Sequence, residues 1–156
     1  MILPDFVGTW MGTNGFRLMP GDPLADSPAA ATVTVAAGGH LTSIGYRWEH
    51  PDDGPQDGLI VVWAAGEDGS LAAVWGDSWH QKPVPMSLSL SGNRGAGGIV
   101  ELDGGYGGGW AWRIVFDTTD VEQFQMRMDN VVPAGEATAE LPSGPYPAMV
   151  MHLRRP

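Results

Sequence analysis

The chain has no cysteine, so disulfide bonds, thiolate metal sites, iron–sulfur clusters and thiol nucleophiles are excluded. Positive charge is also scarce: eight Lys and Arg residues face eighteen Asp and Glu residues, for a net charge of −10. Such a chain repels nucleic acid and anionic membrane surfaces, and we expect neither as a partner. No apolar run approaches the ~20 residues of a membrane-spanning helix, and residues 1–10 lack the basic start of a secretory signal. We therefore expect a soluble, cytoplasmic protein.

The chain does have many short runs of alternating hydrophobic residues, separated by turns. Glycine and proline are frequent, at 23 and 13 copies, yet hydrophobic residues still make up 43% of the 156 residues. The turn residues therefore separate ordered segments. Period-two alternation indicates half-buried strands. It occurs in residues 31–35, 44–48, 59–63, 71–75, 110–116, 124–128 and 149–153.

This pattern predicts an all-β fold of about eight to ten strands, most of them joined as antiparallel hairpins. Closing such a meander into an up-and-down barrel removes its exposed edges, and a β-sandwich is the alternative. We expect residues 1–156 to form a single barrel domain. Residues 19–28 and 133–145 are rich in Pro and Gly, and are either covers of a barrel mouth or ordinary surface loops. The glycine-rich residues 104–109 lead into a strand, which favours a hairpin or bulge over a phosphate loop.

Gly8-Thr9-Trp10 resembles the G-x-W motif that opens the first strand of lipocalins and other calycin barrels. In that family the tryptophan packs under an arginine of the last strand, and the resemblance gives these roles to Trp10 and to Arg154 or its neighbour Arg155. The chain also resembles the actinobacterial lipocalin-like proteins of the DUF1579 type, through residues 7–10, 75–81, 108–112, 128–131 and 144–147. The resemblance implies a lipocalin-like or fatty-acid-binding-protein-like barrel, and it supplies no set of functional residues.

The segment WGDSWHQ, residues 75–81, places a carboxylate between two tryptophans. Strand alternation puts Trp75, Asp77 and Trp79 on one face, and Ser78 and His80 on the other. The first face is more aromatic, and we expect it to line the interior, so that Asp77 points into it and His80 does not. Loss of hydration there would raise the pKa of Asp77, or the carboxylate would hold a cationic amine. Alternatively, Asp77 lies at the wet end of its strand and is merely solvated.

Neighbouring strands add aromatic, methionine and amide side chains, a composition that suits a small-molecule pocket and equally a dry core. Seven tryptophans in 156 residues exceed what packing usually needs, and this favours a flat ligand. Asp77 and Asn130 are the polar groups expected to orient it. The candidate ligand-binding residues are Tyr46, Trp48, Trp75, Asp77, Trp79, Trp110, Trp112, Phe124, Met126, Met128 and Asn130.

The sequence therefore predicts binding of a small, largely apolar or aromatic ligand in a barrel cavity. A second hypothesis is a cofactor-independent cyclase or isomerase with Asp77 as general acid or base. A third is a haem barrel of the nitrobindin type with His152 as the iron ligand. However, this chain lacks the glycine-repeat and Tyr-Pro pattern of that family, and alternation points His152 outward.

No metal site is expected, because the four histidines lack the spacing of zinc motifs. No cofactor is expected either, apart from haem bound through His152 in the third hypothesis. A triad of Asp77, Ser78 and His80 is disfavoured, because strand neighbours point to opposite faces. Homodimer formation stays open.

Overall fold

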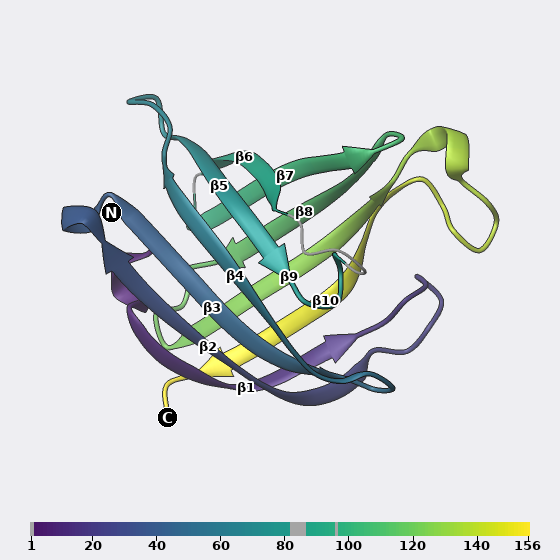
Figure 1. Ribbon diagram of the computed structural model, residues 1–156, viewed down its shortest axis with the longest axis horizontal. Coiled ribbons are helices and arrows are strands. Elements are labelled where there is room, and N and C mark those ends of the chain that lie inside the picture. The colour runs from purple at the N-terminus through teal and green to yellow at the C-terminus, as the bar shows by residue number, and fades with distance from the viewer. Residues whose placement is uncertain (1, 82–86, 96) are drawn as a thin grey trace.

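The computed structural model describes residues 2–81, 87–95 and 97–156. These residues contain ten antiparallel strands, each hydrogen-bonded to its sequence neighbours, and β1 pairs with β10, so the sheet closes into a barrel (Figure 1). The expected all-β up-and-down barrel is confirmed, and the sandwich is excluded. The elements are η1 (Pro4–Phe6), β1 (Gly8–Phe16), β2 (Ala25–Ala36), η2 (Ala37–Gly39), β3 (Leu41–His50), β4 (Gly54–Ala64), β5 (Ser70–Asp77), β6 (Leu88–Arg94), β7 (Ile99–Gly107), β8 (Trp110–Asp117), β9 (Gln123–Val132), η3 (Ala134–Glu136) and β10 (Gly144–Arg154).

Alternation along each strand decides which side chains fill the barrel. On β3, Ile44, Tyr46 and Trp48 are buried while the residues between them are more exposed. On β4 the buried residues include Ile60, whereas Leu59 is 49% exposed. The alternating run at residues 59–63 therefore belongs to the outer face of the barrel. The helical segments in the described part of the chain are single turns, and none is long and apolar enough to cross a membrane.

One end of the barrel is filled by the N-terminal segment. Ile2, Leu3 and Phe6 are buried against the core, and the Phe6 ring stacks on that of Trp10 with centroids 5.6 Å apart. The indole Nε1 of Trp10 donates a hydrogen bond to the Phe6 carbonyl at 2.8 Å, and Thr42 donates one to the Ile2 carbonyl at 2.7 Å. The polar atoms of Trp10 and Thr42 thus have hydrogen-bond partners within the packed apolar core. We call this the plugged end of the barrel.

Arg155 completes the plugged end: of the two arginines that the resemblance offers as partners of Trp10, the structure places Arg155 on its ring and not Arg154. The Arg155 guanidinium lies 4.4 Å from the Trp10 ring centroid and donates to the carbonyls of Asp5 and Val7. Arg154 is exposed on the outer face, because it alternates with the buried Leu153. The alternation of the last strand therefore selects the second arginine.

The opposite end carries long connections, visible away from the termini in Figure 1. The first runs over residues 17–24, since β2 already begins at Ala25, and the second over residues 133–143 with η3. Tyr146 donates to the Leu18 carbonyl at 2.7 Å, and Arg17 donates through Nε to the Pro147 carbonyl at 2.7 Å. The β1–β2 connection is thereby fastened to β10.

The glycine-rich residues 104–109 form the hairpin that the sequence predicts. Gly107, Gly108 and Gly109 all have positive φ, a conformation that side chains with a Cβ rarely adopt. The register of the β7–β8 pair shifts between Gly105 and Gly107, which is the expected bulge. The run therefore shapes the β7–β8 turn beside Trp110.

Candidate functional site

The candidate site begins where β5 ends, because the chain turns sharply after Asp77. The Oδ1 atom of Asp77 accepts hydrogen bonds from the backbone N–H groups of Trp79 and His80, both at 2.8 Å. The Gln81 side chain accepts from the backbone N–H of Asp77 at 3.0 Å and donates to the Trp75 carbonyl at 3.2 Å. Residues 77–81 thus form an Asx-type turn, and strand alternation stops at Asp77.

This turn overturns the expectation that His80 points away from Asp77. The His80 side chain is 1% exposed, and its Nδ1 lies 2.9 Å from Oδ1 of Asp77. Alternation does not apply beyond the strand end, so the two side chains meet. Ser78 does point elsewhere, since its hydroxyl donates to the Gln56 side chain at 2.8 Å. A relay from Ser78 to His80 is therefore absent, and an Asp77–His80 pair is present.

The second oxygen of Asp77 ends a chain of buried hydrogen bonds. Tyr46 donates its hydroxyl proton to Oδ2 of Asp77 at 2.6 Å, and Trp75 donates through Nε1 to the same Tyr46 hydroxyl at 2.7 Å. With the bonds from Trp79 and His80, both carboxylate oxygens are already paired with protein donors. Asp77 therefore holds its neighbours in place, and Nε2 of His80 has no hydrogen-bond partner in the described part of the chain.

The hydrogen bonds around Asp77 favour its ionised form, against the expectation of a raised pKa. Burial raises the pKa of Asp77, but the hydrogen bond and charge of His80 and the hydrogen bond of Tyr46 outweigh it and lower the pKa below its ordinary value. The pKa of Tyr46 is raised well above its ordinary value, by burial first and then by the negative charge of Asp77. The phenol is therefore neutral and the acid is ionised.

Aromatic rings surround His80 on several sides. The His80 ring centroid lies 4.9 Å from that of Trp112, 5.1 Å from Trp79, 5.6 Å from Trp48 and 5.9 Å from Trp75. We call this the aromatic end of the barrel, and it comprises Phe16, Trp48, Trp75, Trp79, His80 and Trp112.

Trp79 belongs to this cluster for a different reason from the one expected. It lies in the turn after β5, where its indole stacks on His50 at 4.7 Å and donates through Nε1 to Asp53 at 2.7 Å. Trp79 is only partly buried, so it forms the rim of the cluster. Trp75 and Trp48 are exposed by only 1% and 2% and form its buried part.

Four buried polar atoms in the described part of the chain have no hydrogen-bond partner. They are Nε2 of His80, Nε1 of Trp48, and both the oxygen and the nitrogen of the Asn14 side-chain amide. Asn14 is 0% exposed and lies two residues before Phe16 on β1. The Phe16 ring centroid is 5.2 Å from that of Trp48 and 6.4 Å from that of His80. Trp48 and His80 are thus neighbours, with ring centroids 5.6 Å apart, and Asn14 lies on the same face of β1 as Phe16, whose ring is near both of them.

The remaining candidate residues divide into two groups. Phe124, Met126 and Met128 are buried in the core, and the Phe124 ring packs on Trp10 and Phe6 towards the plugged end. Asn130 sits at the long-connection end, but not beside Asp77. Its amide accepts from the Tyr106 hydroxyl at 2.8 Å and faces the Tyr146 hydroxyl at 3.4 Å.

Trp110 lies at the start of β8 and is partly buried, with its ring 6.3 Å from that of Tyr106. The Tyr106 ring also stacks on Trp112 at 6.2 Å, which joins this tyrosine group to the aromatic end. Asn130 and Trp110 therefore flank the site from the β7–β9 side. His152 is exposed on the outer face of β10, as alternation predicts, so it does not face the interior.

The sequence reasoning missed Asn14, Phe16, His50 and the orientation of His80. A usable signal existed for His80, because Asp-Ser is a turn-forming pair and Asx turns return the chain onto the aspartate. Asn14 also shares the parity of Trp10 and Phe16, so it could have been placed inside the barrel. Its unpartnered state could not have been foreseen, because that depends on which strands surround it.

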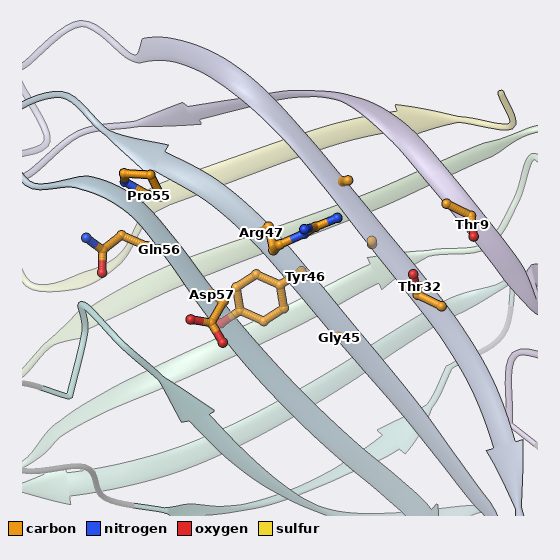
Figure 2. Close-up of a pocket in the computed structure, with 10 residues that line it drawn as sticks. Thr9, Thr32, Gly45, Tyr46, Arg47, Pro55, Gln56 and Asp57 are labelled. Atoms are coloured by element: carbon orange, nitrogen blue, oxygen red, sulfur yellow. The ribbon is translucent and has the colours of Figure 1, made fainter.

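A separate hollow of about 430 Å³ lies against β2, β3 and β4, and Figure 2 shows its lining. Its polar groups include Thr32, Arg47 and Asp57, which are exposed and already face water. None of the unpartnered buried atoms found among the described residues belongs to its lining. The aromatic end is therefore the stronger candidate site.

Comparisons with known proteins support the fold. No family model matches this chain, and no curated protein does so either, so the DUF1579 and lipocalin resemblances have no family match. The crystal structure of Rv2717c from M. tuberculosis superposes with a TM-score of 0.63 and 12% sequence identity. The match covers 99% of this chain and 94% of that one. At this identity the likeness shows a shared barrel fold alone.

Proposed function

We propose that this barrel binds a small, largely apolar or aromatic ligand at its aromatic end. The observation that carries the proposal is the group of unpartnered buried atoms on Asn14, Trp48 and His80. Native proteins leave few buried polar groups unpaired, and each costs about 1–3 kcal/mol. Trp48 and His80 lie side by side among several indole rings, and Asn14 lies on the β1 face of Phe16 beside them. Three such side chains without partners among the described residues support a bound molecule that supplies their hydrogen bonds.

The chemistry of the three side chains limits the ligand. The indole N–H of Trp48 only donates, so it requires an acceptor, whereas the amide of Asn14 requires both an acceptor and a donor. The surrounding rings offer flat apolar surfaces and suit an aromatic body. The ligand that fits is a flat molecule with one polar edge, and its orientation is set by Asn14, Trp48 and His80 instead of Asp77 and Asn130.

Mass spectrometry of the purified protein tests the proposal directly. Native and denaturing spectra of the same sample should differ by the mass of the bound molecule, and an absorbance spectrum should show whether that molecule is coloured. A mass difference without a haem absorption band supports the proposal. A haem band would replace it with the haem hypothesis. Equal masses, together with no change in tryptophan fluorescence on adding aromatic probes, would contradict ligand binding.

Asn14→Leu provides a matched test of the same idea. Leucine has a similar size and needs no hydrogen bond. Without ligand, the variant should therefore be more stable than the wild-type protein, with a free energy of unfolding about 1–3 kcal/mol higher. It should also retain less ligand, because the polar contact is lost. Urea unfolding and native mass spectrometry measure the two effects. A variant that is less stable and keeps its ligand would show that the amide serves the fold and not the ligand.

A further inference from the structure

The arrangement around His80 fixes the state of its two ring nitrogens. Nδ1 lies 2.9 Å from Oδ1 of Asp77, which is ionised and can only accept. Nδ1 therefore carries a proton, and in the neutral ring the free electron pair is on Nε2. Nε2 is buried and has no partner among the described residues. His80 thus presents a proton-accepting atom to the interior, with a carboxylate behind it.

A hydrogen-bond donor lies close to this acceptor. The ring centroids of Trp48 and His80 are 5.6 Å apart, and the Trp48 N–H is also without a partner in the described part of the chain. A buried base beside an unused N–H donor is the combination needed to ionise a hydroxyl group and hold the resulting anion.

Resting on the function proposed above, we propose that the ligand is a flat aromatic compound with a weakly acidic hydroxyl, such as a phenol or enol, and that Nε2 of His80 accepts the hydroxyl proton on binding.

The proton moves from the ligand hydroxyl to Nε2 of His80, and no other reactant is needed. The ligand O–H bond breaks, its electron pair stays on the oxygen, and an N–H bond forms at Nε2. The imidazolium then lies against the Asp77 carboxylate, which stabilises it as carboxylates stabilise the histidine in other acid–base pairs. The ligand oxyanion accepts from the new Nε2–H and from the Trp48 N–H. His80 is the proton acceptor, and Asp77 and Tyr46 are positioning residues.

The other titratable groups nearby do not compete for this proton. Among the described residues these are Asp77, Tyr46, His50 and Asp53. The Asp53 carboxylate accepts from Nε1 of Trp79 at 2.7 Å at the rim of the cluster and is a weaker base than an imidazole. Tyr46 donates its own proton to Asp77, and both oxygens of Asp77 are occupied. His50 accepts the backbone N–H groups of Asp52 and Asp53 through Nδ1, and the Trp79 ring stacks on it.

The probes for this proposal are 4-nitrophenol and its methyl ether, 4-nitroanisole. The phenolate of 4-nitrophenol is yellow and the neutral phenol is not, so the spectrum reports the proton directly. The full-length protein is titrated with each probe at a pH where free 4-nitrophenol is mostly neutral. We expect bound 4-nitrophenol to be yellow, with the amount of bound phenolate falling at least about tenfold in His80→Gln, equivalent to one pKa unit. Asp77→Asn should reduce it less.

Two controls keep the result specific. His152→Gln removes an exposed histidine on the outer face and should leave the yellow signal unchanged. Binding of 4-nitroanisole to the wild-type protein, followed by quenching of tryptophan fluorescence, shows that the site takes the neutral ring, and the circular dichroism spectrum of His80→Gln shows that the variant is folded.

Each alternative result has a definite meaning. Bound 4-nitrophenol that stays colourless in the wild-type protein would overturn proton transfer and leave the proposed binding function standing. Equal yellow signals in wild type and His80→Gln would assign the proton to another group and overturn the role of His80. If neither probe binds, the ligand class is wrong, and the native mass spectra decide whether the proposed function fails with it.

Discussion

Asp77 is a charged side chain with no exposed side-chain surface, held by four hydrogen bonds from Tyr46, Trp79 and His80. Those donors outweigh burial and lower its pKa. A carboxyl whose folded-state pKa lies below the unfolded value of about 3.9 stabilises the fold fully at neutral pH. That stabilisation is lost as the pH falls through the folded-state pKa.

We therefore expect Asp77→Asn to be less stable than wild type at neutral pH, by about 1–3 kcal/mol, because the charged acceptor of these hydrogen bonds is lost. The difference in free energy of unfolding should shrink as the pH falls, because the wild-type carboxyl then becomes neutral as well. Urea unfolding of both proteins, from neutral to acid pH, measures the two curves. Curves that stay parallel throughout would show that ionised Asp77 does not contribute.

The sequence predicted the interior position of Asp77, because alternation applies as far as the last residue of β5. It did not predict the contact with His80, since that contact depends on a turn in which the aspartate side chain binds its own backbone. The predicted rise in pKa was wrong for the same reason. Burial alone was considered, and the donors that reverse its effect come from the turn and from β3.

At the scale of elements, the β3–β4 pair places the Tyr46 ring over a glycine. Tyr46 pairs directly with Gly58, and a Cβ at Gly58 would overlap the tyrosine ring and hydroxyl. The missing side chain gives the ring the space in which its hydroxyl reaches Asp77. Cross-strand pairs of an aromatic residue and glycine are a known device for fixing register.

Gly58→Ala should therefore destabilise the protein by about 1–3 kcal/mol, because the added methyl displaces a buried ring. Gly45→Ala is the matched control, since Gly45 lies on the adjacent strand and a Cβ there meets nothing within 4 Å. Thermal and urea unfolding of both variants provide the comparison. Equal stabilities for the two variants would contradict the close packing of Tyr46 on Gly58.

The strands themselves were largely predictable, and their ends were not. Period-two runs identified most of the strands, because a barrel with one buried face imposes that period throughout. The run at residues 59–63 shows the limit, because its larger residues lie on the outer face while Ile60 is buried. Alternation reveals two faces, and only the neighbouring strands decide which one is inside.

At the scale of the whole molecule, the two ends of the barrel differ in how their buried polar atoms are paired. At the plugged end the polar atoms of Trp10 and Thr42 are paired and the apolar groups are packed. At the aromatic end, Asn14, Trp48 and His80 keep buried polar atoms without partners in the described part of the chain. Proteins depart from full internal pairing mostly at functional sites. This contrast between two ends of one barrel is why we place the ligand at the aromatic end.

At the plugged end, Arg155 near the C-terminus contacts the N-terminal segment, and this gives a prediction that compares Arg155 with Arg154. Arg155→Ala removes the guanidinium from Trp10 together with its hydrogen bonds to the Asp5 and Val7 carbonyls. We expect a loss of about 1–3 kcal/mol, the range for a few charge-assisted hydrogen bonds and an exposed cation–π contact.

Arg154→Ala removes the same charge one residue earlier, from an exposed side chain on the outer face, and should change stability by less than about 0.5 kcal/mol. Urea unfolding of both variants decides between the two arginines. Ligand retention, measured by native mass spectrometry, should be the same in both, because neither residue lies near the aromatic end. If Arg154→Ala is the more damaging change, the closure of the barrel by Arg155 is wrong. If Arg155→Ala loses ligand while remaining as stable as wild type, the separation of the two ends is wrong.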